Sequence, residues 1–163
     1  MCAVFVLVAC SGSRIAAPQH VLRIADFANP NSLNPLLAHD QETIGYDLLI
    51  VQTLVGLDER NRLVPILLTR IPSRANGDIS PDGTRITYHL RHGVRFADGA
   101  ELTSRDVDFT YRAILDPHNS VLSQDAYRRI TWLRTPGRYT VVVGLRHPWN
   151  AAVSELFAQS DFA

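Results

Sequence analysis

The stretch that most constrains the fold runs from Pro81 to Tyr111. Its apolar residues are spaced by two positions within each pair: Tyr88 and Leu90, then Val94 and Phe96. This spacing predicts extended chain with one buried face. Asp82-Gly83 and Asp98-Gly99 predict turns on either side, because Gly adopts positive φ without steric cost and Asp hydrogen-bonds its own backbone.

A capped helix is predicted directly after the second turn. Thr103-Ser104-Arg105-Asp106 has the spacing of a capping box, in which Thr103 accepts from the Asp106 amide and Asp106 reaches back. The following apolar residues recur at helical spacing and form one stripe: Val107, Tyr111, Ile114 and Leu115. Asp116-Pro117 predicts the end of the helix.

The first half of the chain predicts a strand, a helix and a hairpin. Alternation predicts a strand from Val21 to Phe27. Asp40 is a suitable N-cap for a well-buried helix that ends at Gly56, with apolar residues at Ile44, Leu48, Val51 and Val55. A hairpin is predicted over 57–65 with its tip at 59–62, since Asn61 tolerates the left-handed conformation.

The second half predicts a loop, two short helices and a strand. Residues 70–81 are rich in Pro, Ser, Asn and Gly, which is typical of a surface loop. A short helix is predicted from Ser123 to Ile130. The turn at Pro136-Gly137 leads into a strand over 139–145, and a final short helix contains Val153, Leu156 and Phe157.

The order of these features resembles one protein family. The run TYHLRHGVRFADGAELTSRDV resembles the hallmark segment of the family 5 extracellular solute-binding proteins, which are peptide, dipeptide and nickel receptors of ABC importers. Further resemblance lies in residues 32–36, in Leu54–Leu57 followed by Pro65, and in 139–149. The chain departs from the family pattern at Ser104, where relatives more often have Ala.

The resemblance implies an α/β architecture. We expect the N-terminal part of a periplasmic-binding-protein type II-like fold, with a mixed sheet and flanking helices, over residues 21–163. Family members are far longer and close two lobes on a ligand, so the second lobe is expected to be missing and the chain to be incomplete. The receptor then docks on membrane permease subunits, and the isolated chain is expected to bind no peptide with useful affinity.

The first 20 residues predict a lipoprotein signal peptide and tether. Ala3 to Ala9 is an apolar run, too short for the roughly 20 residues of a membrane-spanning helix, and Leu7 to Cys10 resembles a lipobox. Lipidation of Cys10 would anchor an exported protein in the periplasm or at the cell surface. No basic residue precedes the run, so the true start is expected upstream.

Composition argues against several function classes. The chain has 16 basic and 16 acidic residues and a net charge of zero, so no nucleic-acid partner is predicted. Its six histidines lack the spacing of metal ligands, and its two cysteines lie in the leader. No G-x-S-x-G elbow occurs. We therefore predict neither an enzyme, nor a metal site, nor a cofactor.

The resemblance places candidate ligand contacts at the start of the first predicted helix and in a later loop. His39 and Gln41 flank Asp40 where free amides and the helix dipole suit a carboxylate or carbonyl. Asp40 is better explained as the cap, and a solvated role for His39 stays open. Ser123 is the third candidate. Trp132 and Trp149 are predicted to pack in the core or at its rim.

Two other functions stay open at this point. The same family domain serves as a sensory module in regulators, although nothing basic or helix-turn-helix-like precedes Val21. A non-functional remnant of a broken gene would also explain the expected missing lobe. The ligand stays open among peptide, nickel complex, oligosaccharide and opine.

Overall fold

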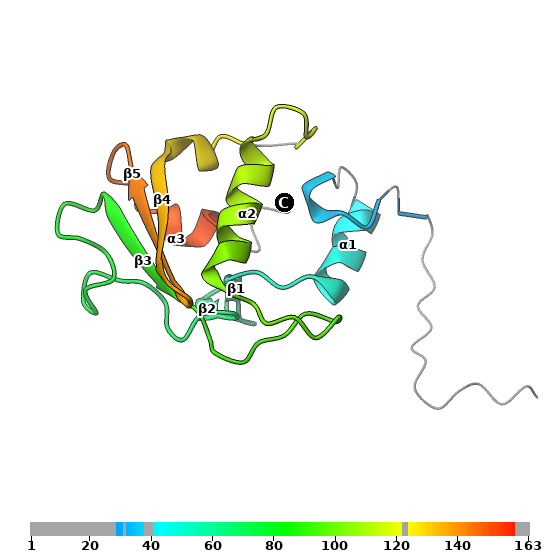
Figure 1. Ribbon diagram of the computed structural model, residues 1–163, viewed down its shortest axis with the longest axis horizontal. Helices are drawn as coiled ribbons and strands as arrows, with labels where there is room; N and C mark the ends of the chain where they lie inside the picture. Colours follow the sequence, from blue (N-terminus) through cyan, green and yellow to red (C-terminus); the bar gives the residue numbers. More distant parts are fainter. Residues whose placement is uncertain (1–28, 31, 38–40, 122–123, 159–163) are drawn as a thin grey trace, which may run out of the picture.

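A computed structural model describes residues 29–30, 32–37, 41–121 and 124–158 of the chain. Short helices and strands follow one another in this part, with η marking 3₁₀-helices (Figure 1): η1 (Pro35–Leu37), α1 (Gln41–Ile50), β1 (Val55–Leu57), β2 (Leu63–Pro65), β3 (Arg85–His89), α2 (Ser104–Leu115), η2 (Tyr127–Arg129), β4 (Ile130–Gly137), β5 (Thr140–Leu145) and α3 (Ala152–Glu155). The predicted strand from Val21 to Phe27 lies outside the described residues.

The main sheet has the strand order β3-β5-β4, and both of its pairings are antiparallel. Its inner face carries side chains that are almost fully buried: Ile86, Tyr88, Val141, Val143 and Leu145. In Figure 1, α2 and α3 lie on one side of this sheet. Val107 of α2 and Val153 of α3 belong to the same buried cluster, so the helices cover the apolar face.

The predicted hairpin is confirmed as β1 and β2. Val55 is opposite Pro65, and Leu57 is opposite Leu63. Asn61 has φ 55, the left-handed conformation that the tip was expected to need. Val55 also forms an isolated parallel bridge with Ala158, which ties the hairpin to the end of the described chain.

The capping box of α2 is confirmed. The Thr103 N–H donates to Asp106 Oδ2 at 2.7 Å, and the helix begins at the next residue. Val107 and Ile114 are buried, which confirms the predicted apolar stripe. The helix ends at Leu115, with Asp116 in extended conformation before Pro117.

The prediction of extended chain with one buried face through Phe96 holds only in part, because Arg95 forms an isolated antiparallel bridge with Glu101 but does not continue the strand. β3 begins earlier, at Arg85, and ends at His89, and only Leu90 continues it as an isolated bridge to Leu68. Gly93 has φ 73, so the chain turns there rather than continuing the strand. Phe96 is consequently 48% exposed and does not belong to a buried face.

The predicted helix up to Gly56 is too long. α1 ends at Ile50, and Val55 and Gly56 lie in β1 instead. Val55 is fully buried between β2 and Ala158, and this packing outweighs the helical spacing. Leu49 and Ile50, which lie outside the predicted stripe, are each 61% exposed, whereas the side chains of Ile44 and Leu48 lie outside the described part, so the burial of this stripe stays a prediction.

The chain from 124 to 137 differs from prediction in two ways. The helix predicted from Ser123 to Ile130 is a single 3₁₀ turn over Tyr127–Arg129, and the strand β4 that follows it was not predicted. The α/β class is confirmed. Within the described residues, both sheets are antiparallel, and the parallel pairing is the Val55–Ala158 bridge.

The described residues form only short helices. None of their helices has both the length and the apolar character needed to cross a bilayer.

Candidate ligand-facing segment

The candidate segment begins with a turn built around Asn34. The Asn34 N–H donates to Ser32 Oγ at 3.0 Å, and Asn34 Oδ1 accepts from the Leu36 N–H at 3.1 Å. The Asn34 carbonyl accepts from the Leu37 N–H at 2.9 Å. These local bonds start η1 and direct Leu36 against the buried core, so the turn is anchored at one point.

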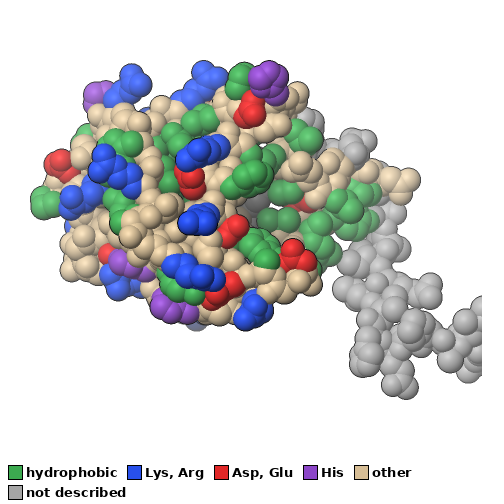
Figure 2. Space-filling model, in the orientation of Figure 1, with side chains coloured by type: hydrophobic (Ala, Val, Ile, Leu, Met, Phe, Trp, Pro, Cys, Tyr) green, Lys and Arg blue, Asp and Glu red, His purple; other side chains and the backbone are tan. Residues whose placement is uncertain are grey.

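Helix α1 follows and carries an unusual burial pattern. Asp47 is 1% exposed, whereas Leu49 and Ile50 are exposed. Leu33, before η1, is also 60% exposed. Figure 2 shows hydrophobic side chains gathered where η1 and α1 lie in Figure 1. Among the α1 side chains that the structure describes, a carboxylate is therefore buried and two apolar side chains are exposed.

The structure describes little of the predicted contact residues. Gln41 is the first residue of α1, as predicted, but its side chain lies outside the described part. His39, Asp40 and Ser123 also lie outside the described residues. Their roles therefore stay predictions, and the structure does not test whether they come together.

The two tryptophans occupy different places. Trp149 packs against the buried cluster, and the Arg129 guanidinium lies 4.7 Å from its ring centroid, which fits the predicted rim packing. Trp132 lies on the sheet face opposite the core and is 37% exposed. It is therefore not part of the core.

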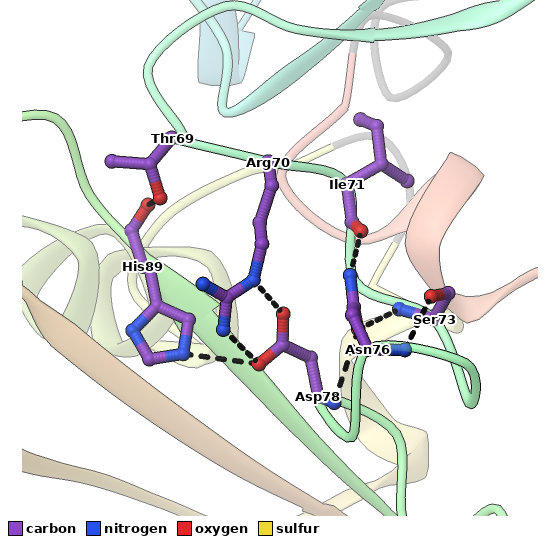
Figure 3. Close-up of polar contacts among 7 residues, drawn as sticks. All are labelled: Thr69, Arg70, Ile71, Ser73, Asn76, Asp78 and His89. Carbon is purple, nitrogen blue, oxygen red and sulfur yellow. Dashed lines mark hydrogen bonds and ion pairs between the residues drawn. The ribbon is translucent and has the colours of Figure 1, made fainter.

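A polar network fastens the loop before β3 to the sheet (Figure 3). Arg70 donates through Nε to Asp78 Oδ2 at 2.6 Å and through a terminal nitrogen to Oδ1 at 2.8 Å. His89 Nε2 lies 3.0 Å from the same Oδ1. The hydrogen bond from Arg70, helped by His89, lowers the pKa of the buried Asp78 carboxyl.

Asn76 completes the network by organising the loop itself. Its Oδ1 accepts from the Ser73 N–H at 3.0 Å and from the Asp78 N–H at 3.2 Å. Its Nδ2 donates to the Ile71 carbonyl at 2.9 Å. Residues 74–77 of the loop are exposed, as predicted, whereas Asp78 and Ser80 are buried, and the backbone is held by side-chain hydrogen bonds.

A second hub holds the loop between β3 and α2. Glu101 accepts from the Tyr139 hydroxyl at 2.6 Å, from Arg138 at 2.7 Å and from the Gly93 N–H at 3.2 Å. The Tyr139 bond is the main reason that the pKa of Glu101 is lowered, and the same bond raises the pKa of Tyr139. His92 stacks on the Tyr139 ring at 4.0 Å between centroids.

These arrangements are those of a scaffold. The carboxylates of Asp78 and Glu101 are each occupied by cations or hydroxyl donors. Within the described ranges, no group of three or more His, Cys, Asp or Glu side chains is placed to hold a metal ion. The sequence analysis missed both hubs, because their members lie up to 38 residues apart and no local motif joins them.

A comparison with models of protein families shows to which family the chain belongs. Residues 62–162 match the model of the bacterial extracellular solute-binding proteins, family 5 Middle. This match covers both polar hubs, α2 and the main sheet. The chain belongs to this family. The resemblance inferred from the hallmark segment is thereby confirmed.

Two curated relatives extend the match toward the N-terminus. Protein XP55 of Streptomyces lividans is 35% identical over 141 residues, which are 85% of this chain and 23% of the relative. The glutathione-binding protein GsiB of Escherichia coli is 26% identical over 133 residues, 82% of this chain and 25% of its own length. The chain therefore spans about a quarter of the curated relatives that it matches.

A solved relative confirms the fold. The periplasmic binding protein AgaA from A. tumefaciens, solved in complex with agropinic acid, superposes with a TM-score of 0.72 at 26% identity. The superposition covers 82% of this chain and 26% of AgaA. The α/β arrangement described above is thus that of one part of a periplasmic binding protein.

Proposed function

We propose that the chain is part of the substrate-binding receptor of an ABC importer for a small solute such as a peptide. The observation that carries this proposal is the family match over residues 62–162, which includes the main sheet and its fastened loops. GsiB binds glutathione and AgaA is solved with agropinic acid, so small polar solutes are the ligand class that the relatives favour.

Within this receptor, the η1–α1 segment is the ligand-facing part and the main sheet is its support. His39, Gln41 and Ser123 are the proposed contacts, and the free amides at the start of α1 suit an anionic or carbonyl group. The exposed Leu33, Leu49 and Ile50 lie in the same segment. Apolar walls with a few polar contacts are the usual make-up of small-molecule sites.

Export and membrane attachment belong to the same proposal. Residues 1–20 serve as lipoprotein signal peptide and tether, residues 21–163 as part of the first lobe, and Cys10 as the lipidated residue. The closed receptor then docks on permease subunits in the membrane. Labelled palmitate incorporated by the wild type and lost in Cys10→Ser supports the anchor, and equal labelling of both contradicts it.

A chimera tests the receptor function with a ligand of known identity. The segment of GsiB that aligns with this chain is replaced by the corresponding residues of this chain, and glutathione is titrated by calorimetry. We expect the chimera to bind glutathione within about tenfold of GsiB, because the two segments are 26% identical over 133 residues. A chimera that folds cooperatively but binds no glutathione contradicts the proposal.

Substitutions in the chimera then test the contact residues. Gln41→Ala is expected to weaken glutathione binding about tenfold, the effect of one lost hydrogen bond of roughly 1.4 kcal/mol. Gln52→Ala is the matched control, because Gln52 is exposed just beyond the end of α1. Equal glutathione affinities of the two variants would show that Gln41 does not contact the ligand.

A further inference from the structure

The outer face of the main sheet carries a feature that solute binding does not use. Each strand alternates between the core and this face, which is the side away from α2 and α3 in Figure 1. The register sets two rows of residues across the three strands on this face. The first row is Arg85, Gly144 and Trp132, and the next is Thr87, Val142 and Arg134.

Trp132 lies flat on this face because Gly144 has no side chain. A Cβ built on Gly144 would lie 2.1 to 2.6 Å from atoms of the indole ring, closer than any real contact. The Arg134 guanidinium lies 4.9 Å from the centroid of the same ring. The indole is therefore held between the floor of the sheet and a cation, although it stays 37% exposed.

The face is positive and its cations are available. β3, β4 and β5 contain no Asp or Glu. Asp78, which reaches His89 at one end of β3, is buried and already paired with Arg70. Neither Arg85 nor Arg134 has a carboxylate partner in the part of the chain that the structure describes, whereas Arg62, Arg112 and Arg138 each have one.

We propose that this sheet face, centred on Trp132 and flanked by Arg85 and Arg134, is a docking surface for an acidic protein surface. Its charge is complementary to carboxylates, and Trp and Arg are the residues that dominate binding energy at protein interfaces. The register places Thr87, Val142, Thr140 and His89 on the same face, and none of its three strands adds a carboxylate.

The same geometry disfavours two other occupants. A small solute needs a concave site that buries most of its surface, and the outer face of a three-stranded sheet, on which Trp132 stays 37% exposed, does not bury one. An anionic bilayer is favoured by aromatic side chains that project into the interface. The Trp132 indole lies along the sheet instead, against Gly144.

A short poly-glutamate peptide serves as the acidic probe for the full chain. The chain has two tryptophans, so its NMR spectrum contains two indole N–H signals, which a Trp132→Phe variant assigns. We expect the peptide to shift the Trp132 signal and to leave the Trp149 signal in place. A poly-glutamine peptide controls for effects other than charge.

Paired arginine variants decide whether the site is local. The double variant Arg85→Gln/Arg134→Gln is expected to weaken peptide binding about tenfold. Arg60→Gln/Arg105→Gln removes the same charge from the hairpin tip and from α2, where both side chains are exposed, and is expected to change the affinity less than about twofold.

Three results would overturn the proposal. One is an equal loss of affinity in both arginine pairs, which would mean unspecific attraction. Another is an unshifted Trp132 signal at low salt. The third is Trp132-dependent binding to phosphatidylglycerol vesicles without binding to the peptide, which would assign the face to a membrane.

Discussion

The sheet with its loops and the η1–α1 segment are built in opposite ways. In the sheet region, buried side chains such as Tyr88 and Val141 fill one continuous core, and polar hubs around Asp78 and Glu101 hold the connecting loops. In the η1–α1 segment, Leu33, Leu49 and Ile50 are exposed, and Asp47 is buried.

This difference separates support from recognition. A receptor lobe needs a framework that keeps its shape when the lobes close, and the fastened loops provide that. A ligand-facing segment needs apolar surface and accessible amides, which are costly to leave unburied and are therefore kept few in number. The exposed Leu49 and Ile50 of α1 are thus part of the proposed function rather than a packing defect.

The largest expected effect on stability comes from comparing a buried leucine near the sheet with an exposed leucine of α1. Leu156→Ala should lower the free energy of unfolding by about 2–5 kcal/mol, because Leu156 is fully buried and its removal leaves a cavity. Leu49→Ala, at a position 61% exposed, should change it by less than about 0.5 kcal/mol. Urea unfolding followed by circular dichroism measures both, and similar losses would break the contrast.

Removing the centre of the Arg70 network tests the fastened loop. Asp78→Ala should cost about 1–3 kcal/mol, since it leaves Arg70 and His89 without their carboxylate. Loop 70–81 should also become sensitive to limited proteolysis. Asp125→Ala is the control, because Asp125 is exposed. If the two variants unfold at the same urea concentration, the network does not hold the loop.

A double-mutant cycle tests whether the Trp132 indole packs directly on Gly144. Gly144→Ala should destabilise the chain by about 1–3 kcal/mol, because the new methyl group overlaps the indole ring. The cost should largely disappear when Trp132 is already replaced by alanine. An unchanged cost in that background would mean that the backbone, and not the indole, requires glycine at 144.

Acid should weaken the loops progressively. Arg70 lowers the pKa of Asp78, Tyr139 lowers that of Glu101, and Ser80 with Thr84 lowers that of Asp82 to about 2. A lowered pKa means that stabilisation is complete above the ordinary values of 3.8 and 4.5 and is lost as the pH falls through the folded-state values.

The unfolding free energy should therefore fall as the pH is lowered from about 4.5 toward 2. Asp78→Asn should make this fall shallower, because one of the linked groups no longer titrates. The effect is expected to be the smallest of the four, since Asp82 and Glu101 are near solvent. A stability that is flat between these pH values would contradict the role of the hubs.

Local chemistry explains which elements were predictable. The Thr103–Asp106 cap and the Asn61 turn depend on residues within a few positions, so the sequence predicts them correctly. The end of α1 and the strand β4 depend on distant partners. Val55 leaves the helical pattern because β2 and Ala158 bury it, and β4 exists because β5 pairs with it.

The site was less predictable than the fold. His39, Gln41 and Ser123 came from the family resemblance, and the structure leaves them untested. The Asp78 and Glu101 hubs join residues from separate loops, so no spacing in the sequence indicates them. The packing of the Trp132 indole on Gly144 requires the pairing of β4 with β5, which the sequence did not predict.

Amide hydrogen exchange on the GsiB chimera tests the central division between support and recognition most directly. With glutathione bound, we expect increased protection over residues 32–50 and unchanged protection in β3 and β5, whose buried side chains lead us to expect the slowest exchange even without ligand. Protection that increases in β3 and β5 but not over 32–50, with glutathione bound, would contradict the account.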